Sequence, residues 1–446
     1  MFPNPQTALP LPLRPSLERY RKLAKELSKA CKSGDERAIG DWAEQWVHAI
    51  GKLNRSEGNR REELDRRTSQ VEDFAHRRMR GGQPAGRPCT LAAAQFVIAR
   101  LHGFESWPKF ARHLEALHQS DAPVSRFEAA ADAIVNGDVA ALKRLLREDP
   151  DLLRARSTRE HGATLLHYVS ANGVEGYRQK TPKNIVEIAG ILLHAGADVD
   201  AAANVYGGGC TALGLAATSI HPEQAGVQEE LLEALLNHGA QMEPPPVAGN
   251  QQSIVIACLE NGRSKAAEFL ASRGAPLDLA GAAAVGNLGI VRSFIGETGG
   301  LPANTTREQL NAALTFACGT GRNTAIELLL GKGADLAAQR GGQTGLHWAV
   351  IGGHLETVQL LLRNHAPLEV ENVYGGTPLG QALWSAAHGG DADVYLAILD
   401  ALAAAGAAIP QRHVPVNPRV DSWLARHGSR AEPAWYWYGE EPRRKR

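Results

Sequence analysis

The chain has 446 residues, of which 43% are hydrophobic, and it carries equal numbers of basic and acidic side chains, 48 of each. This length exceeds what one compact core usually supports, so several domains or an architecture built by repetition are expected. The neutral balance argues against a general nucleic-acid binder. The apolar stretches are too short and too interrupted to cross a membrane, and the N-terminus lacks the apolar segment of a signal peptide.

Five cysteines, Cys31, Cys89, Cys210, Cys258 and Cys318, are scattered along the chain without a C-x-x-C pair. Cys258 and Cys318 each follow Ala in a predicted helix, which indicates buried free thiols. Unpaired cysteines in odd number are typical of a reducing compartment, so the sequence predicts a cytoplasmic protein.

The first 124 residues hold 21 basic and 15 acidic side chains, and the remainder carries the opposite excess. Ser16 is placed to cap a helix that runs to about Lys32, with apolar residues on one stripe. A second helix is expected over 36–53, with Trp42 and Trp46 one turn apart. Residues 54–89 are rich in Arg and Glu and poor in apolar residues, so they are predicted to be partly helical at best, with 81–88 a linker.

Residues 90–118 predict a helical hairpin, in which Thr90 caps the first helix, Gly103 ends it and Ser106-Trp107-Pro108 opens the second. A DNA-binding helix-turn-helix is the alternative interpretation. Pro108 and two charged residues, Lys109 and Arg112, fall where such a recognition helix needs continuity and buried apolar residues. We therefore favour a structural cap for the elements that follow.

Residues 344–362 form a phrase, TGLHWAVIGGHLETVQLLL, that recurs in weaker copies along most of the chain. In each copy a Thr or Ser caps a short helix, a Gly ends it, and a second helix with paired leucines follows. The second helices end in a Gly-Ala step in which Gly is the C-cap, as at Gly196-Ala197, Gly239-Ala240, Gly274-Ala275 and Gly333-Ala334. Such a pattern predicts stacked helix pairs.

The spacing supports one type of unit. Gly321 and Gly353 are 32 residues apart, and two copies of Asn-Val-Tyr-Gly-Gly, starting at Asn204 and Asn372, are 168 apart. These values fit units of about 33 residues. The phrase resembles the T-P-L-H-x-A core of the ankyrin repeat, which implies an all-α ankyrin-repeat solenoid. About eight degenerate helix–turn–helix units are expected, at 125–157, 158–203, 204–246, 247–279, 280–305, 306–339, 340–371 and 372–412.

The copies depart from the pattern in three places. The second carries an insertion near 176–183 and the third near 220–226, and both are expected to be loops on one face of the stack. The fifth copy is short, with a poor second helix. Residues 91–117 resemble the N-terminal helical segment of bacterial ankyrin proteins, so three parts are predicted: 1–124, an N-terminal helical cap domain with its Arg/Glu-rich linker; 125–412, the repeats; and 413–446, a C-terminal cap and tail.

A search for chemistry finds no nucleophile elbow, zinc-protease or phosphate-loop motif, so no catalytic, cofactor-binding or metal-ligating residue is predicted. Gly331-Lys332-Gly333 lacks the strand and loop of a phosphate site, and the glycines at 207–209 are read as a hairpin turn. The resemblance implies that His167 and His347, at the T-P-L-H position, hydrogen-bond the backbone of a neighbouring turn.

Ankyrin repeats bind proteins through hairpin tips and the exposed face of their first helices, so the resemblance implies a partner-binding role for the matching positions. Aromatic residues are enriched at binding hot spots, which draws attention to Tyr206, Tyr374 and Trp384, whereas Trp348 is expected to pack in the core. The candidate residues are Glu160, His161, Val205, Tyr206, Arg340, Gln343, Ile351, Val373, Tyr374, Trp384 and Ser385.

Near the C-terminus, Trp423-Leu424 predict a final helix that covers the last repeat. The run Trp435-Tyr436-Trp437-Tyr438 is expected to pack along the stack, because four exposed rings favour aggregation. Arg443–Arg446 is read as a solvated basic tail.

The sequence thus predicts a non-catalytic scaffold that binds an unidentified protein partner, with no cofactor, no small-molecule substrate and no membrane association. Two alternatives stay open. The first is a regulatory or accessory subunit of an enzyme, which a pocket with converging titratable side chains would favour. The second is a nucleic-acid-associated protein that uses the Arg-rich residues 54–88, for which salt-sensitive binding would be the evidence.

Overall fold

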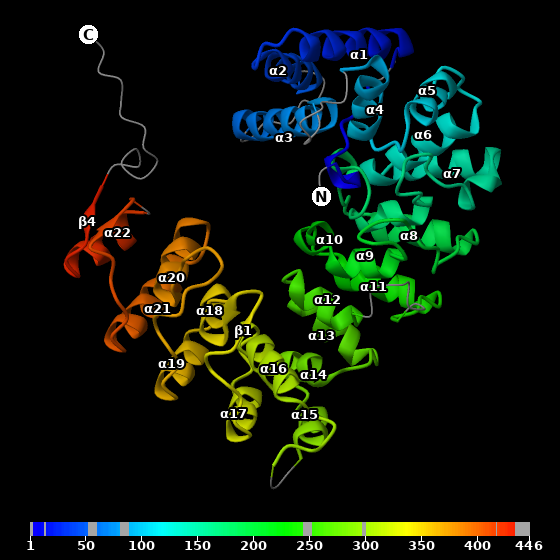
Figure 1. Cartoon of the computed structure of the whole chain (residues 1–446). Coiled ribbons are helices and arrows are strands. Elements are labelled where there is room, and N and C mark those ends of the chain that lie inside the picture. Colours follow the sequence, from blue (N-terminus) through cyan, green and yellow to red (C-terminus); the bar gives the residue numbers. More distant parts are fainter. Residues whose placement is uncertain are drawn as a thin grey trace, which may run out of the picture. The chain divides into compact units, whose positions relative to one another are not determined.

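The computed structural model describes residues 3–12, 15–51, 60–80, 89–243, 252–296, 300–415 and 417–432. Within these ranges almost all of the regular secondary structure is helical (Figure 1). The strands there are two-residue pairs, β1 (Gln339–Arg340) with β2 (Gln343–Thr344) and β3 (Arg412–His413) with β4 (Arg430–Ala431). The contacts divide the chain into two compact units, residues 1–254 and 255–446.

The first unit begins with a short 3-10 helix and five α-helices. Ser16 and Thr90 cap the first and fourth α-helices, as the sequence predicts, by accepting hydrogen bonds from the amides of Arg19 and Ala93. The helices enclose one hydrophobic cluster, in which Tyr20, among others, is buried. The elements are η1 (Pro5–Thr7), α1 (Leu17–Lys32), α2 (Ala38–Gly51), α3 (Arg60–Arg80), α4 (Leu91–Leu101) and α5 (Trp107–Ala116).

Helix α3 fills residues 60–80 of the segment 54–89 that was expected to be partly helical, and residues 54–59 and 81–88 lie outside the described ranges. The helix is continuous over 21 residues and packs against α2 and α4. Four apolar residues of its second half lie on one helical face, at i, i+3, i+4 and i+8, and are buried: Val71, Phe74, Ala75 and Met79. One narrow apolar stripe thus anchors a helix whose average composition is polar, because the arginines occupy its other faces.

The predicted helical hairpin is present as α4 and α5. Phe110 and Leu114 of α5 are buried, and Lys109 and Arg112 are exposed. Helix α5 packs against α6 (Pro123–Asn136), the first helix of the first repeat, which is the contact expected of a structural cap.

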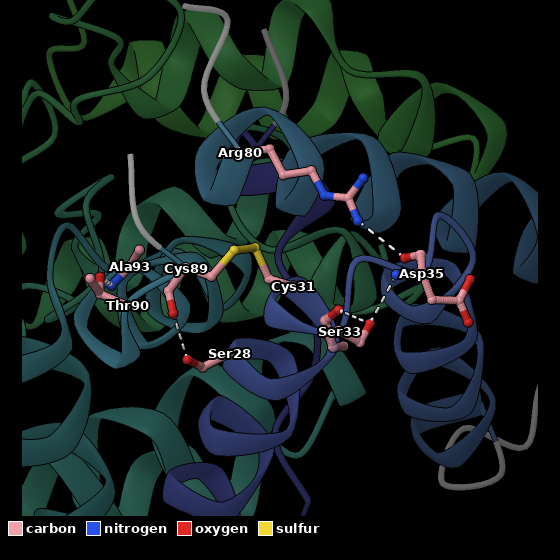
Figure 2. The surroundings of a disulfide bond; sticks show 9 residues. Ser28, Cys31, Ser33, Asp35, Arg80, Cys89, Thr90 and Ala93 are labelled. Atoms are coloured by element: carbon pink, nitrogen blue, oxygen red, sulfur yellow. Dashed lines mark hydrogen bonds between the residues drawn. A yellow bond between two sulfur atoms is a disulfide. The ribbon is translucent and has the colours of Figure 1, made fainter. Parts of the chain in front are cut away.

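A disulfide joins Cys31, near the end of α1, to Cys89, just before α4 (Figure 2). The carbonyl oxygen of Cys89 also accepts a hydrogen bond from Ser28 Oγ at 2.8 Å. This pair corrects the expectation of unpaired cysteines, although Cys258 and Cys318 are free and buried as predicted. Burial raises the pKa of the Cys258 thiol to about 12, which keeps it unreactive. The cysteines therefore do not argue for a reducing compartment, and the cytoplasmic location stays a prediction.

The first three repeats complete the first unit. Their first and second helices are α6 with α7 (Val139–Glu148), η3 (Leu165–Ser170) with α8 (Ile185–His194), and α9 (Ala212–Thr218) with α11 (Gln228–Asn237). The second repeat opens with a 3-10 helix in place of an α-helix. The insertion of the third is a short helix, α10 (Ile220–Gln224); the remaining elements are η2 (Pro150–Leu153) and η4 (Gly176–Arg178).

The second unit stacks its helices in two rows. First helices contact one another in the order α14, α16, α18, α20, and second helices in the order α15, α17, α19, α21 (Figure 1). The pairs are α12 (Ile254–Glu260) with α13 (Ser264–Ser272), α14 (Leu279–Val285) with α15 (Leu288–Ile295), α16 (Arg307–Gly319) with α17 (Asn323–Gly331), α18 (Gly345–Ile351) with α19 (Leu355–Arg363), and α20 (Pro378–Ala387) with α21 (Ala392–Ala404).

The fifth repeat corrects the expectation of a poor second helix, because Val291 and Ile295 of α15 are buried. The predicted terminal helix is α22 (Pro418–Arg426), which packs on α21. Its Trp423 is buried and donates a hydrogen bond from Nε1 to Asp400 Oδ1 at 2.6 Å. The residues 435–438 and 443–446 lie outside the described ranges.

His167 and His347 hold adjacent repeats together, as the resemblance implies. Nε2 of His347 donates to the carbonyl oxygen of Gly376 at 3.0 Å, and Nε2 of His167 donates to that of Cys210 at 3.2 Å. Nδ1 of each ring lies 2.8 Å from the Oγ1 of the threonine that caps its own helix. Burial lowers the pKa of His167 to about 4 and lowers that of His347, so both rings are neutral at pH 7.

The insertion of the second repeat corrects the expectation of a surface loop. Its Arg178 is buried, as is the adjacent Glu175, and Arg178 Nη1 lies 2.7 Å from Glu128 Oε2 on α6. Arg159, also buried, contacts the other oxygen of Glu128 at 2.6 Å and Oε1 of Glu175 at 2.9 Å. These four residues form the buried ionic cluster.

The buried ionic cluster balances two guanidinium groups against two carboxylates. Burial alone would raise the pKa of Glu128, but the two arginines hold it at about 2 and keep the pKa of Glu175 well below its usual range. Asp132, at the edge, adds a 2.7 Å contact to Arg178. Such a network stabilises the fold only while each charge keeps its partners.

Candidate partner-binding surface

The four predicted contact residues of the first unit are largely engaged within it. The amide of Glu160 donates to the carbonyl oxygen of Gly103 at 2.9 Å, and its carboxylate pairs with Arg100. His161 and Val205 are buried, so a partner cannot reach their side chains in this structure. Tyr206 is 55% exposed, although its hydroxyl donates a hydrogen bond to Asn172 Oδ1 within the same unit.

In the second unit, Arg340 lies at the hairpin tip formed by β1 and β2. Its guanidinium carbon is 4.0 Å from the centroid of the Phe316 ring on α16, and its Nη2 pairs with Glu260 at the end of α12. A cation over an aromatic face is attracted to the ring, so Arg340 is fixed across the first helices. Gln343, in β2, is half-buried with an Oε1 that lacks a hydrogen-bond partner.

Two predicted positions on first helices contribute little exposed surface. Ile351 is half-buried, and its carbonyl oxygen accepts a hydrogen bond from the hydroxyl of Tyr395 at 3.2 Å. Ser385 is buried, and its Oγ accepts a hydrogen bond from Gln381 Nε2 at 3.2 Å. Trp348 is half-buried against Gly319, in agreement with its expected packing role.

The exposed aromatic surface is concentrated in the eighth repeat. Val373, Tyr374 and Trp384 are 66%, 88% and 58% exposed, and they make up half of the six large apolar side chains that are exposed in the described part of the chain. We refer to these three residues as the aromatic surface. The other three, Leu91, Tyr206 and Ile220, lie in the first unit at separate places in the sequence.

Local contacts hold the aromatic surface in a defined conformation. Asn372 Oδ1 accepts hydrogen bonds from the amides of Tyr374 at 2.9 Å and Gly376 at 3.0 Å, which fixes the hairpin tip. Val373 lies against Gly342 of the preceding tip, where a Cβ would collide with it. Trp384 stacks on His388, with ring centroids 4.2 Å apart. The Trp384 ring and the backbone of the hairpin tip are therefore presented with little conformational freedom to lose on binding.

Among the described residues, no group of three or more His, Cys, Asp or Glu side chains is arranged to hold a metal ion. A cavity of about 240 Å³ between α1 and α2 is lined mainly by apolar residues such as Leu23, Trp42 and Trp46, and its rim carries the exposed pair Lys22 and Glu26. No helix of the described ranges is long and apolar enough to span a membrane.

Sequence reasoning missed the residues that set up these surfaces. Phe316 and Glu260 anchor Arg340. They lie 24 and 80 residues before it in the sequence, so no local motif predicts either contact. The only available signal for Phe316 is its place in a first helix, since an aromatic residue there faces either the core or the binding side.

Two rows of stacked helices joined by hairpin tips define a helical-repeat architecture. A family model for three copies of the ankyrin repeat matches residues 279–372 and 317–408. Residues 279–408 therefore carry ankyrin repeats, and such repeats are generally protein–protein interaction modules.

Solved structures of the same kind are similar to the chain at low identity. The ankyrin repeat domain of human ASB11 is 20% identical, with a TM-score of 0.33, and the match covers 61% of this chain and 96% of that one. The ankyrin repeat domain of Bcl-3, described as a member of the IkappaB protein family, is 20% identical, with a TM-score of 0.29 and coverage of 62% and 97%. The comparison with curated proteins finds no match.

Proposed function

We propose that the chain is a non-catalytic scaffold and that its second unit binds a protein partner through the aromatic surface. Arg340 and Phe316 extend this surface along the first helices. The partner contributes an apolar segment that packs on Tyr374 and Trp384, with polar groups that reach Arg340 and His388.

One observation carries the proposal. Val373, Tyr374 and Trp384 fall within twelve residues of one repeat and are all more than half exposed. Scattered single apolar residues on a surface are ordinary, but an exposed group with two aromatic rings on one repeat is typical of a binding hot spot. No comparable role in core packing explains a tyrosine that is 88% exposed.

Site-specific photocrosslinking tests the proposal. A photoreactive phenylalanine analogue at Trp384 should capture a discrete protein in the native host, whereas the same analogue at Ile220 should not. Ile220 is the matched control because it is also an exposed large apolar residue, at 42%, on a short helix of the first unit.

The capture is then challenged with Tyr374→Ala and with Val373→Ser, each placed in the chain that carries the analogue at 384. Loss of a hot-spot aromatic typically weakens binding at least tenfold, so capture should fall in proportion. Equal capture at 384 and 220, or capture that neither substitution weakens, would refute the surface. Thermal unfolding of each variant separates loss of binding from loss of fold.

A further inference from the structure

The N-terminal segment Asn4–Leu9 reaches the second and third repeats of the first unit through Gln6, while Leu9 packs among the N-terminal helices. Gln6 Nε2 donates hydrogen bonds to Asn172 Oδ1 at 3.3 Å and to the hydroxyl of Tyr206. The same hydroxyl donates to Asn172 Oδ1 at 2.7 Å. The side chain of one glutamine thus hydrogen-bonds two groups that come from different repeats.

The receiving groups are also held by contacts that do not involve Gln6. Asn172 Nδ2 donates to the carbonyl oxygen of Leu215 at 3.2 Å and to Thr218 Oγ1 at 3.1 Å, which aims its Oδ1 at Gln6. Gly176 provides the backbone seat, since a Cβ at this position would collide with the carbonyl oxygen of Gln6. Asn172, Gly176 and Tyr206 together form what we call the glutamine socket.

The backbone around the socket is strained. In the described ranges only three non-glycine residues have positive φ, and two of them, Ala171 at 47° and Tyr206 at 51°, belong to this place. Such conformations are disfavoured for residues with a Cβ and cluster at ligand-binding positions.

The second copy of Asn-Val-Tyr-Gly-Gly supplies an internal comparison. Tyr374 has the same four neighbours in sequence as Tyr206, but its φ is not positive and its ring is 88% exposed. The loop that contains Tyr206 is two residues longer before its capping threonine, Thr211, than the loop before Thr377. The added length gives Tyr206 its reach, and Asn172 and Gln6 determine where its hydroxyl goes.

Beyond Gln6 the segment is held by a short apolar stretch and two backbone contacts. Ala8, Leu9 and Pro10 are buried. The amide of Leu9 donates to the carbonyl oxygen of Leu101 at 2.8 Å, and Nδ1 of His102 donates to that of Leu9 at 2.8 Å. The segment therefore docks as a peptide does, by a polar side chain, a few small apolar groups and its main chain.

We propose that the glutamine socket is a peptide-binding site whose ligand is an extended segment with a glutamine followed by small apolar residues. The chain's own residues 4–9 fill this site as a detachable intramolecular ligand. The segment competes with any external peptide of the same chemistry, and its release frees Tyr206 and the adjoining repeat surface.

Fluorescence polarisation of a labelled peptide with the sequence of residues 3–12 tests the proposal on the full chain. Leu9→Asp buries a charge where a leucine packs, so it should dislodge the segment and let the peptide bind. The unmodified chain should bind it at least 100-fold more weakly, because a tethered ligand competes at millimolar effective concentration. Failure of a folded Leu9→Asp chain to bind the peptide overturns the proposal.

Matched variants locate the binding. Tyr206→Phe, added to Leu9→Asp, should lower the affinity for the peptide about two- to tenfold, as expected for a lost side-chain hydrogen bond. Tyr374→Phe should have no effect. Gly176→Val should abolish binding by filling the seat of the peptide main chain. Equal affinity with all three would place the peptide elsewhere and overturn the assignment.

Hydrogen exchange of the unmodified chain provides a measurement that no variant can confound by unfolding. If the segment detaches, the amide of Leu9 exchanges at least 100-fold faster than the central amides of α4, through an opening that leaves the helices intact. Equal protection of Leu9 and α4 would show that the segment is a fixed part of the core, and the proposal would fail.

Discussion

Arg178→Met is the perturbation that tests the buried ionic cluster most directly. The guanidinium of Arg178 lies 2.7 Å from Glu128 and 2.7 Å from Asp132, and its Nη1 lies 3.6 Å from Glu175. Its removal leaves two buried carboxylates with one cation, Arg159. Methionine retains much of the apolar stem, so the change isolates the charge.

Breaking a buried pair by removing one partner costs about 3–5 kcal/mol, because the remaining charge stays desolvated. For a unit of roughly 250 residues, each kcal/mol lowers Tm by about 2–4 °C, so a loss of roughly 10 °C is expected. Urea unfolding is the suitable assay, since guanidinium would screen the charges. Exchange of the α6 amides reports on the first unit separately.

Two further variants decide whether charge is the cause. Arg144→Met removes an exposed arginine, paired with Glu148 at 3.9 Å, and should change stability by less than about 0.5 kcal/mol. Adding Glu128→Gln to Arg178→Met restores the charge balance and should recover part of the loss. If Arg178→Met costs no more than Arg144→Met, the stabilising role assigned to the cluster is wrong.

Three other perturbations give separate tests. Changing Cys31 and Cys89 to Ser opens a loop of 58 residues and should cost about 4 kcal/mol in non-reducing thermal unfolding, whereas under reducing agent the two forms should unfold alike. Trp423→Ala should cost about 3–5 kcal/mol in the second unit by exposing the last repeat, and His427→Ala beside it should cost far less. Burial lowers the folded pKa of three histidines of the first unit: His102 to about 3, and His113 and His167 each to about 4. Because their unfolded pKa is about 6.5, the free energy of unfolding should be highest above pH 6.5 and should fall by about 1.4 kcal/mol per pH unit, down to about pH 4, for each histidine still neutral in the fold. Replacing the three histidines by Gln should flatten this pH dependence.

Local signals predicted much of this fold. Thr344 caps α18 and His347 ties it to the next turn because both interactions lie within a few residues or at a fixed repeat offset. The same holds for Ser16, Thr90 and the final helix around Trp423. Where a short sequence motif determines a contact, the motif alone is enough to predict that contact.

Contacts between distant residues could not be predicted in this way. Arg178 meets Glu128 across 50 residues, and no spacing rule links an insertion to the first helix of the preceding repeat. A carboxylate amid the alanines of α6 was a usable hint, since a charge on an apolar helix face needs a buried partner. The length of helix α3 was hard to predict for another reason, because the average composition of its segment conceals the single apolar stripe.

The predicted binding residues differ in whether they contact another segment of their own chain. Tyr206 and Tyr374 share one five-residue motif, and in the described structure only Tyr206 contacts the N-terminal segment. A triple change of Tyr206, Tyr374 and Trp384 to Ala would therefore mix two functions. Tyr206→Ala alone should loosen residues 4–9 and leave crosslinking at 384 unchanged, whereas Tyr374→Ala should do the reverse. If either substitution altered both measurements, the two surfaces would have to act as one site, and the separation between intramolecular and partner recognition would be untenable.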